Sequence, residues 1–260
     1  MALHRWIRWA GAILIASAPM ATPAAPDTQP LQLRFVAQPW PPFIHEENGK
    51  PAGPFADIVQ AACEAIRAQC TIEIFPWRRA LQMTTEGEAD GLLAILDLPE
   101  RKQLFHLSPP LIHTAYVLYA QQDSTLRDPT PAMLAGYTVA AFGPSGTSSV
   151  AAKLAREAPN ARLTVEIDNA TALRKLRMGR YGSKAVVVLN ADLGIWLMRQ
   201  EGDAGLRQVG EVQKITYHIG MARKHLPPAV KDRFIAALEE MVRNGTVRDI
   251  AARYGMRGVQ

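Results

Sequence analysis

The sequence predicts an α/β protein made of two units, each an open, mostly parallel sheet flanked by helices. Strand-like and helix-like segments alternate with short links over residues 31–96, which indicates parallel strand pairing. The same alternation starts again near Tyr137 and continues through residue 200. Two amphipathic segments at 228–245 and 246–255 close the chain, and each ends at a glycine, as helices commonly do.

The elements of the first unit follow from hydrophobic periodicity. An alternating segment at 31–37 predicts a strand, and an apolar stripe at helical spacing predicts the next helix, which Asp57 is expected to cap. The remaining expected elements are strands at 71–75, 90–96 and 114–121 and a helix at 78–89.

The second unit repeats this order of elements. The chain enters it near Gln121 and returns near residues 213–217, so these two places are the expected connections. The expected elements are strands at 137–143, 162–167, 184–190 and 215–223 and helices at 145–158, 169–179 and 191–200.

A proline-rich corner at residues 39–43 follows the first predicted strand and carries Trp40 and Phe43. In open α/β sheets, ligands bind beyond the carboxyl ends of the strands, and a cleft between two such units is the default site. We therefore expect this corner to form one wall of a ligand cleft. Its stiffness keeps the wall preformed, so that binding free energy is not spent on ordering it.

Composition and charge exclude several classes of function. The 260 residues carry a formal net charge of +5, and basic residues are interleaved with acidic ones, which is typical of a solvated surface and not of a nucleic-acid-binding face. The six histidines are scattered without the spacing of a metal site. We expect no nucleic-acid partner, no metal and no cofactor.

Residues 1–24 have the pattern of a secretory signal peptide. Arg5 and Arg8 precede a short apolar stretch, and the small residues up to Ala24 form a cleavage site. The apolar stretch is shorter than the roughly 20 residues of a membrane-spanning helix. We expect an exported protein of the periplasm.

The chain has two cysteines, Cys63 and Cys70, and export permits a disulfide between them. A continuous helix would place their Cα atoms about 10 Å apart, which is beyond the roughly 7 Å limit of a disulfide. If the two are bonded, the helix must end before Cys70 and the chain must turn back. The alternative is a pair of buried free thiols.

Several motifs follow the signal peptide in this order: "WPPF" with "NGKPAGPFADIV", "GEADGLL", "LPERKQLFHLSPPL", "GPSGTSS" and "MVRNGTVRDIAARYG". In these stretches the chain resembles the periplasmic solute-binding proteins of the polar amino-acid type, family 3 of the binding components of ABC transporters. The resemblance spans nearly the whole mature chain. The spacing of Cys63 and Cys70 is similar to that of the disulfide in the histidine and lysine/arginine/ornithine binders of this family.

The resemblance implies a two-lobed fold of type II, with lobe 1 at residues 31–120 and 218–260 and lobe 2 at 121–217. Such a protein closes on a small-molecule ligand by hinge bending and presents the closed form to an inner-membrane ABC permease. The resemblance thus implies a binding protein and not an enzyme, and we expect a monomer.

The resemblance also implies particular site residues. Trp40 takes the position of an aromatic residue against the ligand side chain, and Trp77 that of a second hydrophobic wall. Phe43 either joins the site or packs the corner. Arg101 matches the arginine that grips the ligand carboxylate, for which a guanidinium fork is suited, and the alternative is a surface salt bridge with Glu100.

A further group is expected at the start of a helix. Gly146, Thr147 and Ser148 offer backbone N–H groups and hydroxyls there, and the family uses this turn to hold the same carboxylate. Ordinary N-capping selects the same residue types, and the two interpretations are compatible.

One departure from the family pattern bears on the ligand. Amino-acid binders carry an aspartate near the strand at 184–190 to pair with the α-ammonium group, whereas this chain has Lys184, Leu189 and Asn190 there. Asp97 either supplies the missing negative charge or caps a turn. We therefore expect a polar, carboxylate-bearing ligand, an amino acid or a related compound, with Asp97 and Asn190 as further candidate contacts.

Two residues near the return connection, Tyr217 and His218, are also candidates to line the cleft. Two other functions stay open. Cyclohexadienyl dehydratases resemble this family and use an acid in the cleft, but this chain lacks an acid on the second-lobe strand and a complete nucleophile elbow. The other function is a ligand-sensing module for a membrane signalling partner.

Overall fold

The computed structural model describes residues 30–200 and 205–259, and the predicted signal peptide at 1–24 lies outside them. The first elements are β1 (Leu31–Ala37), β2 (His45–Glu47), β3 (Lys50–Ala52), α1 (Pro54–Ala65), β4 (Ala68–Ile74), α2 (Trp77–Glu86), β5 (Gly91–Leu96), α3 (Pro99–Leu104), β6 (Phe105–Leu107) and β7 (Ile112–Gln121). Next come η1 (Pro131–Leu134), β8 (Thr138–Phe142), α4 (Gly146–Glu157), β9 (Arg162–Glu166), α5 (Asn169–Arg177), β10 (Ala185–Asn190), α6 (Ala191–Gln200), β11 (Leu206–Ala222), α7 (Pro228–Arg243), α8 (Thr246–Arg253) and β12 (Arg257–Gly258).

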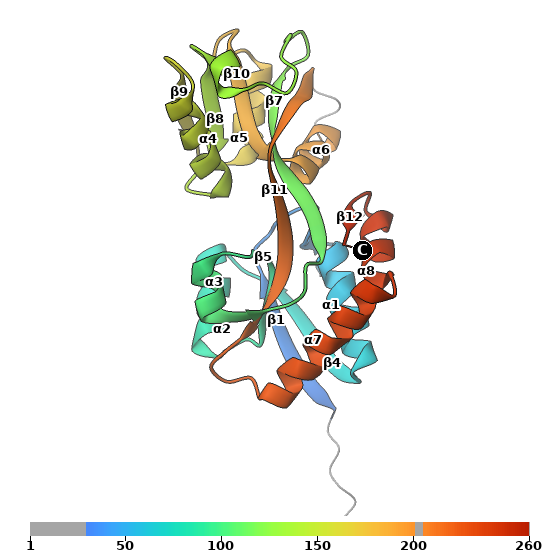
Figure 1. The fold of residues 1–260 in the computed structure, drawn as a ribbon. Coiled ribbons are helices and arrows are strands. Elements are labelled where there is room, and N and C mark those ends of the chain that lie inside the picture. Colours follow the sequence, from blue (N-terminus) through green and yellow to red (C-terminus); the bar gives the residue numbers. More distant parts are fainter. Residues whose placement is uncertain (1–29, 201–204, 260) are drawn as a thin grey trace, which may run out of the picture. The chain divides into compact units, whose positions relative to one another are not determined.

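The strands β1, β4 and β5 form a parallel group, as their sequence pattern predicts. β1 pairs with β4 over its whole length and with β5 on its other side. Side chains of β1 alternate between two apolar layers, because successive residues of a strand point to opposite faces. Phe35 packs with α1, α7 and α8, where its ring lies 5.0 Å from that of Phe234, and Val36 packs with α2 on the other face (Figure 1).

The strands β8, β9 and β10 form a second parallel group. β10 is buried along its whole length, which agrees with its uninterrupted apolar sequence. The helices α4 and α5 pack against this group, and the chain passes directly from β10 into α6 (Figure 1).

Two long strands join these groups into one sheet. β11 pairs with β5, β7 pairs with β10, and β7 and β11 pair antiparallel with each other, in the order β4-β1-β5-β11-β7-β10-β8-β9. The two places expected to connect the units lie in these strands: Gln121 is the last residue of β7, and residues 213–217 lie within β11. Polar residues and register shifts beside Gly210 break the alternation of β11, so its length is not visible in the sequence pattern.

The hairpin β2–β3 follows the proline-rich corner. Its turn residues Asn48 and Gly49 have φ angles of 52° and 73°, the left-handed conformation that an Asn-Gly hairpin turn requires. Among the described helices, none is both long enough and apolar enough to cross a membrane.

Asp57 does not cap α1. The helix begins at Pro54, with Gly53 at the N-cap position. A Cβ at residue 53 would lie only 2.7 Å from the Phe43 carbonyl oxygen, so this position requires glycine. Asp57 instead accepts hydrogen bonds from Arg253 at 2.9 Å and from the Tyr254 hydroxyl at 3.0 Å. Its carboxylate thus fastens the end of α8 to the first turn of α1.

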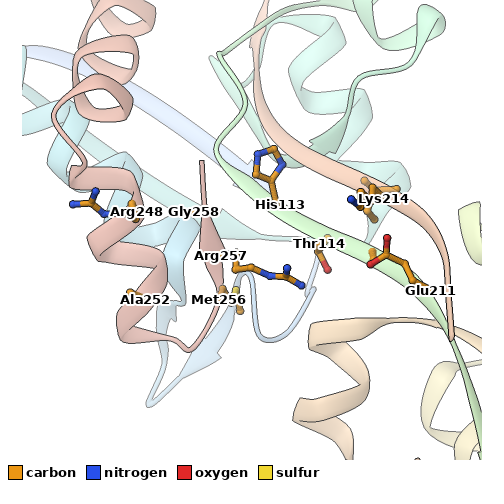
Figure 2. A pocket seen from close by; sticks show the side chains of 11 residues that line it. His113, Thr114, Glu211, Lys214, Arg248, Ala252, Met256, Arg257 and Gly258 are labelled. Carbon is orange, nitrogen blue, oxygen red and sulfur yellow. The ribbon is translucent and has the colours of Figure 1, made fainter. Parts of the chain in front are cut away.

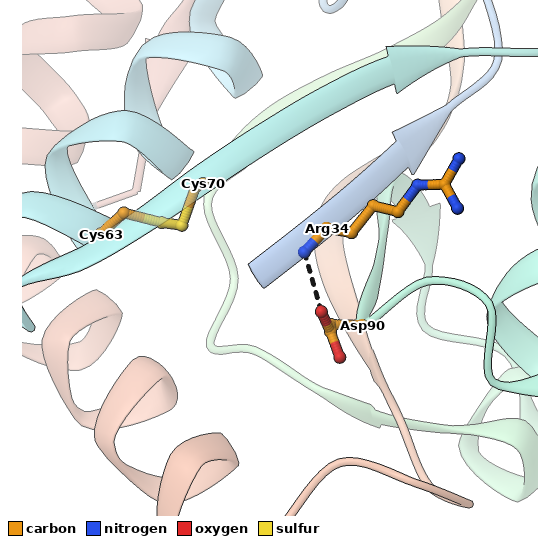
Figure 3. Close-up of a disulfide and its surroundings, with 4 residues drawn as sticks. All are labelled: Arg34, Cys63, Cys70 and Asp90. Carbon is orange, nitrogen blue, oxygen red and sulfur yellow. Dashed lines mark hydrogen bonds between the residues drawn. A yellow bond between two sulfur atoms is a disulfide. The ribbon is translucent and has the colours of Figure 1, made fainter. Parts of the chain in front are cut away.

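Cys63 and Cys70 form a disulfide with a Cα–Cα distance of 6.2 Å (Figure 3). The expected turn is present, because α1 ends at Ala65 and Arg67 has a left-handed φ angle of 53°. On the neighbouring strand the Arg34 backbone N–H donates to Asp90 at 2.7 Å (Figure 3). The predicted pairing and the geometric condition attached to it are both confirmed.

Removal of the disulfide in a Cys63→Ser/Cys70→Ser variant is expected to lower the free energy of unfolding by about 2–3 kcal/mol, since the bond closes a short loop of the unfolded chain. For a chain of this size the melting temperature should fall by roughly 5–10 °C. Thermal unfolding of the variant and of wild type checks this. A reducing agent should lower the melting temperature of wild type only, and an equal response of both proteins would contradict the prediction.

Candidate functional site

The proline-rich corner folds back on itself at the carboxyl end of β1. The Trp40 backbone N–H donates to the Ile44 carbonyl at 2.7 Å, and the Phe43 N–H donates to the Trp40 carbonyl at 2.9 Å. Trp40 is half-buried, whereas Phe43 has 0% exposure. Phe43 therefore supports the corner from inside, and Trp40 is the residue of the two that presents a surface.

Tyr217 of β11 holds Trp40 in place. The Trp40 indole N–H donates to the Tyr217 hydroxyl at 3.1 Å, and the Phe43 ring meets the edge of the Tyr217 ring at 4.9 Å. Burial raises the pKa of Tyr217 far above its usual range, although side-chain hydrogen bonds with Trp40 and Asn190 oppose this. The hydroxyl is therefore neutral at physiological pH and is a fixed part of the wall.

Asn190 lies at the end of β10 with 0% exposure. Its Oδ1 accepts the Leu193 backbone N–H at 3.0 Å, and its Nδ2 donates to the Thr114 hydroxyl at 3.2 Å. The sequence suggested Asn190 as a ligand contact. In the structure the Asn190 side-chain amide forms hydrogen bonds within the protein, to β7, to α6 and to Tyr217.

Sequence reasoning missed Asp192, a carboxylate in the first turn of α6. Its Oδ2 accepts the Thr114 hydroxyl at 2.5 Å. Burial raises the pKa of Asp192, against the lowering effect of that hydrogen bond and of Arg257. The one signal in the sequence was its place two residues after Asn190, at the start of a helix.

Arg101 and Trp77 form a pair at the start of α3 and α2. The Arg101 guanidinium carbon lies 4.8 Å from the centroid of the Trp77 ring, a cation–π distance. Burial lowers the pKa of Arg101, and Glu100 opposes this. Among the described residues no carboxylate lies within 4.0 Å of the guanidinium nitrogens, so the alternative salt bridge with Glu100 is not formed.

Asp97 has a partner of its own. Its carboxylate lies 2.8 Å from the Lys102 ammonium, and both side chains are exposed. Asp97 therefore forms an ion pair with a neighbouring lysine. Within the described chain, no hydrogen bond or ion pair joins it to Arg101 or Trp77.

The start of α4 keeps two backbone donors free. Ser145 is the N-cap, and its hydroxyl and that of Ser148 exchange hydrogen bonds with each other's backbone N–H. Thr147 is buried with its hydroxyl 2.8 Å from that of Ser145. In the described residues the N–H groups of Gly146 and Thr147 have no acceptor, and a Cβ at Gly146 would collide with the Tyr116 hydroxyl.

The structure therefore brings some predicted residues together and leaves others apart. Trp40, Phe43 and Asn190 meet around Tyr217, and Tyr116 beside Asn190 in the sheet reaches the start of α4. Within the described residues, no hydrogen bond, ion pair or ring contact joins the Arg101–Trp77 pair to that group. His218 is buried with its Nδ1 2.9 Å from the Ser108 carbonyl, so its ring serves packing between strands.

The described residues form two cavities that the predicted ligand contacts do not line. One of about 420 Å³ lies between the hairpin, the end of α8 and α6, with Asp192 and Trp196 in its wall. The other lies between β7, β11 and the C-terminal segment. Among the described residues, no three His, Cys, Asp or Glu side chains are grouped so that they could hold a metal ion.

Replacement of Tyr217 with phenylalanine is expected to lower the free energy of unfolding by about 1–3 kcal/mol, because the part-buried hydrogen bond between the Trp40 N–H and the Tyr217 hydroxyl is lost. Equilibrium denaturation in urea measures this. Tyr137→Phe is the matched control, since no described residue bonds to the Tyr137 hydroxyl, and it should change stability little. Equal stability of the two variants would contradict the role given to Tyr217.

Comparison with known proteins agrees with the sequence pattern. Residues 33–257 match the family model of the bacterial extracellular solute-binding proteins, family 3. A search of curated protein sequences gives no significant match.

Solved structures of similar fold include a histidine kinase sensor domain with similarity to periplasmic binding proteins, with 21% identity, TM-score 0.70, and coverage of 87% of this chain and 97% of that one. An ancestral arginine-binding protein bound to arginine has 21% identity and TM-score 0.68, with 86% and 97% coverage. The L-cystine solute receptor of Neisseria gonorrhoeae, unliganded and open, has 18% identity and TM-score 0.67, with 88% and 95% coverage. These likenesses confirm the predicted two-lobed α/β fold class.

Proposed function

The chain belongs to the bacterial extracellular solute-binding proteins of family 3, and we propose that it captures a small, polar, carboxylate-bearing ligand in the periplasm and delivers it to an ABC permease. The observation that carries this proposal is Arg101. Its guanidinium lies over Trp77, is partly desolvated and has no carboxylate partner in the described chain. A guanidinium in that state is suited to a bidentate bond with a carboxylate.

The other predicted contacts take supporting roles. The free N–H groups of Gly146 and Thr147 lie at the start of α4, in the second lobe. They could donate hydrogen bonds to the same ligand carboxylate. The face of Trp40 suits the remainder of the ligand, since Tyr217 keeps the indole fixed without ligand. Closure by hinge bending would act through β7 and β11, the strands shared by both parallel groups.

The ligand need not be a standard α-amino acid. Asn190 is occupied by internal hydrogen bonds, and the nearby carboxylate of Asp192 accepts the Thr114 hydroxyl. Asp97 is paired with Lys102. Asp97 and Asp192 thus each have a partner within the described chain, so the proposed ligand class is defined by its carboxylate.

A thermal-shift screen of the mature protein tests the proposal, with amino acids, opines, small dicarboxylates, amines and prephenate as probes. A ligand at a hundred times its dissociation constant should stabilise the folded protein by about 2.7 kcal/mol. A stabilising compound that carries a carboxylate supports the proposal. Stabilisation by amines alone would contradict it.

A sensory role is the second candidate, because a histidine kinase sensor domain has a similar fold.

For the enzyme alternative, one candidate acid is present: Asp192, whose pKa is raised by burial. Consumption of prephenate by the protein, measured by mass spectrometry, would favour the enzyme. Binding without turnover would favour the two ligand-binding roles.

A further inference from the structure

A cavity of about 590 Å³ lies between the strand pair β7–β11 and the C-terminal segment (Figure 2). One wall comes from β7 and β11 and the other from α8 and β12. β12 holds this wall in position because it pairs with β7, with Arg257 opposite His113. The ligand contacts proposed above do not line it, so this cavity is separate from the proposed site.

The lining of this cavity has an excess of positive charge. Lys214, Arg248 and Arg257 face Glu211, and His113 adds an imidazole whose Nδ1 lies 2.9 Å from the Thr216 hydroxyl. Figure 2 shows Arg257 extending from β12 toward β7, with Glu211 and Lys214 beyond it on β11.

Among the described residues, two of these cations form no ion pair. Arg248 is paired with Asp249 at 3.0 Å on the exposed side of α8. In the described part of the chain, Lys214 and Arg257 have no carboxylate within 4.0 Å. Arg257 acts on Asp192 from a longer distance, through the lowering of that carboxyl's pKa. A cavity with unpaired cations on two opposing walls favours an anion with more than one negative group.

The rest of the lining is apolar. Ala115 and Ile215 on the strands and Ala252 and Met256 on the C-terminal segment offer carbon surface between the charges. Such a surface favours an organic skeleton over a bare inorganic anion, which keeps its hydration shell. A few charged groups around an apolar floor are typical of small-molecule sites.

We propose that this cavity is a second ligand site, which binds a small organic polycarboxylate. One carboxylate pairs with Arg257 and another with Lys214, and the carbon skeleton lies against Ile215 and Met256. The bound molecule bridges the C-terminal segment and β11. This site does not depend on the ligand contacts of the proposed function.

The test uses citrate as the probe, by isothermal titration at constant ionic strength, with sulfate as the inorganic comparison. Wild type should bind citrate saturably at one site, and sulfate should bind more weakly. Arg257→Gln and Lys214→Gln should each weaken citrate binding by about tenfold or more, as expected for loss of a charged hydrogen bond. Arg257→Lys, which keeps the charge, should retain part of the affinity and guards against a folding defect.

Two controls separate this site from other effects. Lys224→Gln removes an exposed positive charge elsewhere and should leave citrate binding unchanged. Arg162→Ala, which removes an exposed arginine of β9, should also leave it unchanged. The proposal is overturned if citrate gives no saturable binding, if sulfate matches it, if Lys224→Gln weakens it as much as Arg257→Gln does, or if Arg162→Ala abolishes it.

Discussion

Replacement of Arg101 with alanine is expected to weaken binding of the carboxylate-bearing ligand by about 30-fold to a few thousand-fold, and to leave the protein folded. The guanidinium is partly desolvated over Trp77 and has no carboxylate partner in the described chain, so the ligand carboxylate would be its counter-ion. Truncation would leave that carboxylate buried without a partner, which accounts for the size of the effect. Isothermal titration with the compound found in the screen measures it.

Two further variants make the Arg101 result specific. Arg101→Lys keeps the charge but loses the two-pronged geometry, so its affinity should fall between wild type and Arg101→Ala. Arg162→Ala removes an exposed arginine of β9 and should bind like wild type. If Arg101→Ala binds as tightly as Arg162→Ala, the site is not at Arg101, although the protein could still be a binding protein.

Replacement of Phe43 with alanine is expected to lower the free energy of unfolding by about 3–5 kcal/mol, the usual cost of deleting a buried aromatic ring. Phe43 has 0% exposure and packs against Tyr217 at 4.9 Å and Trp40 at 6.4 Å between ring centroids. The cavity left behind would also release Trp40, so ligand affinity should fall under conditions where the variant is still folded.

Urea denaturation of the Phe43→Ala variant measures the loss of stability. The control is Ile167→Ala, whose side chain is 82% exposed and should change stability by less than about 0.5 kcal/mol. A loss below about 1 kcal/mol in Phe43→Ala would mean that the corner repacks easily. Weaker binding with unchanged stability would instead assign Phe43 a direct contact with the ligand.

Much of the fold could be predicted because its signals are local. The alternation in β1, the apolar run of β10 and the stripe of α1 each depend on neighbours within a few residues, and the parallel pairing follows from their order. The start of α1 was predicted wrongly at Asp57, although Pro54 at the first helical position is a local signal for the earlier start. The sequence does not show why residue 53 is glycine, since that depends on its close approach to the Phe43 carbonyl.

For the candidate site, too, some features could be predicted from the sequence and others could not. Motifs indicated Trp40, Trp77 and Arg101 as candidate ligand contacts. Their contact with a ligand stays a prediction, as do the lobe boundaries and the signal peptide. The pairing of Arg101 with Trp77 was not predicted, because it depends on how α2 and α3 are placed. Asp192 was missed because its carboxylate becomes part of the site only when β7 brings Thr114 beside it.

The α/β class and the order of the main strands and helices followed from the sequence, because periodicity acts over a few residues. The family followed from the resemblance of several motifs, which the family model confirms. Which side chains meet depends on the tertiary structure. Trp40 and Tyr217 are 177 positions apart, and their hydrogen bond forms because β5 pairs with both β1 and β11, which brings the corner after β1 close to Tyr217. Strand register fixes the direction of each side chain, and register is set by pairing between distant segments. The basic cavity beside β7 and β11 has the same origin, since β11, α8 and β12 meet there only after the sheet is complete.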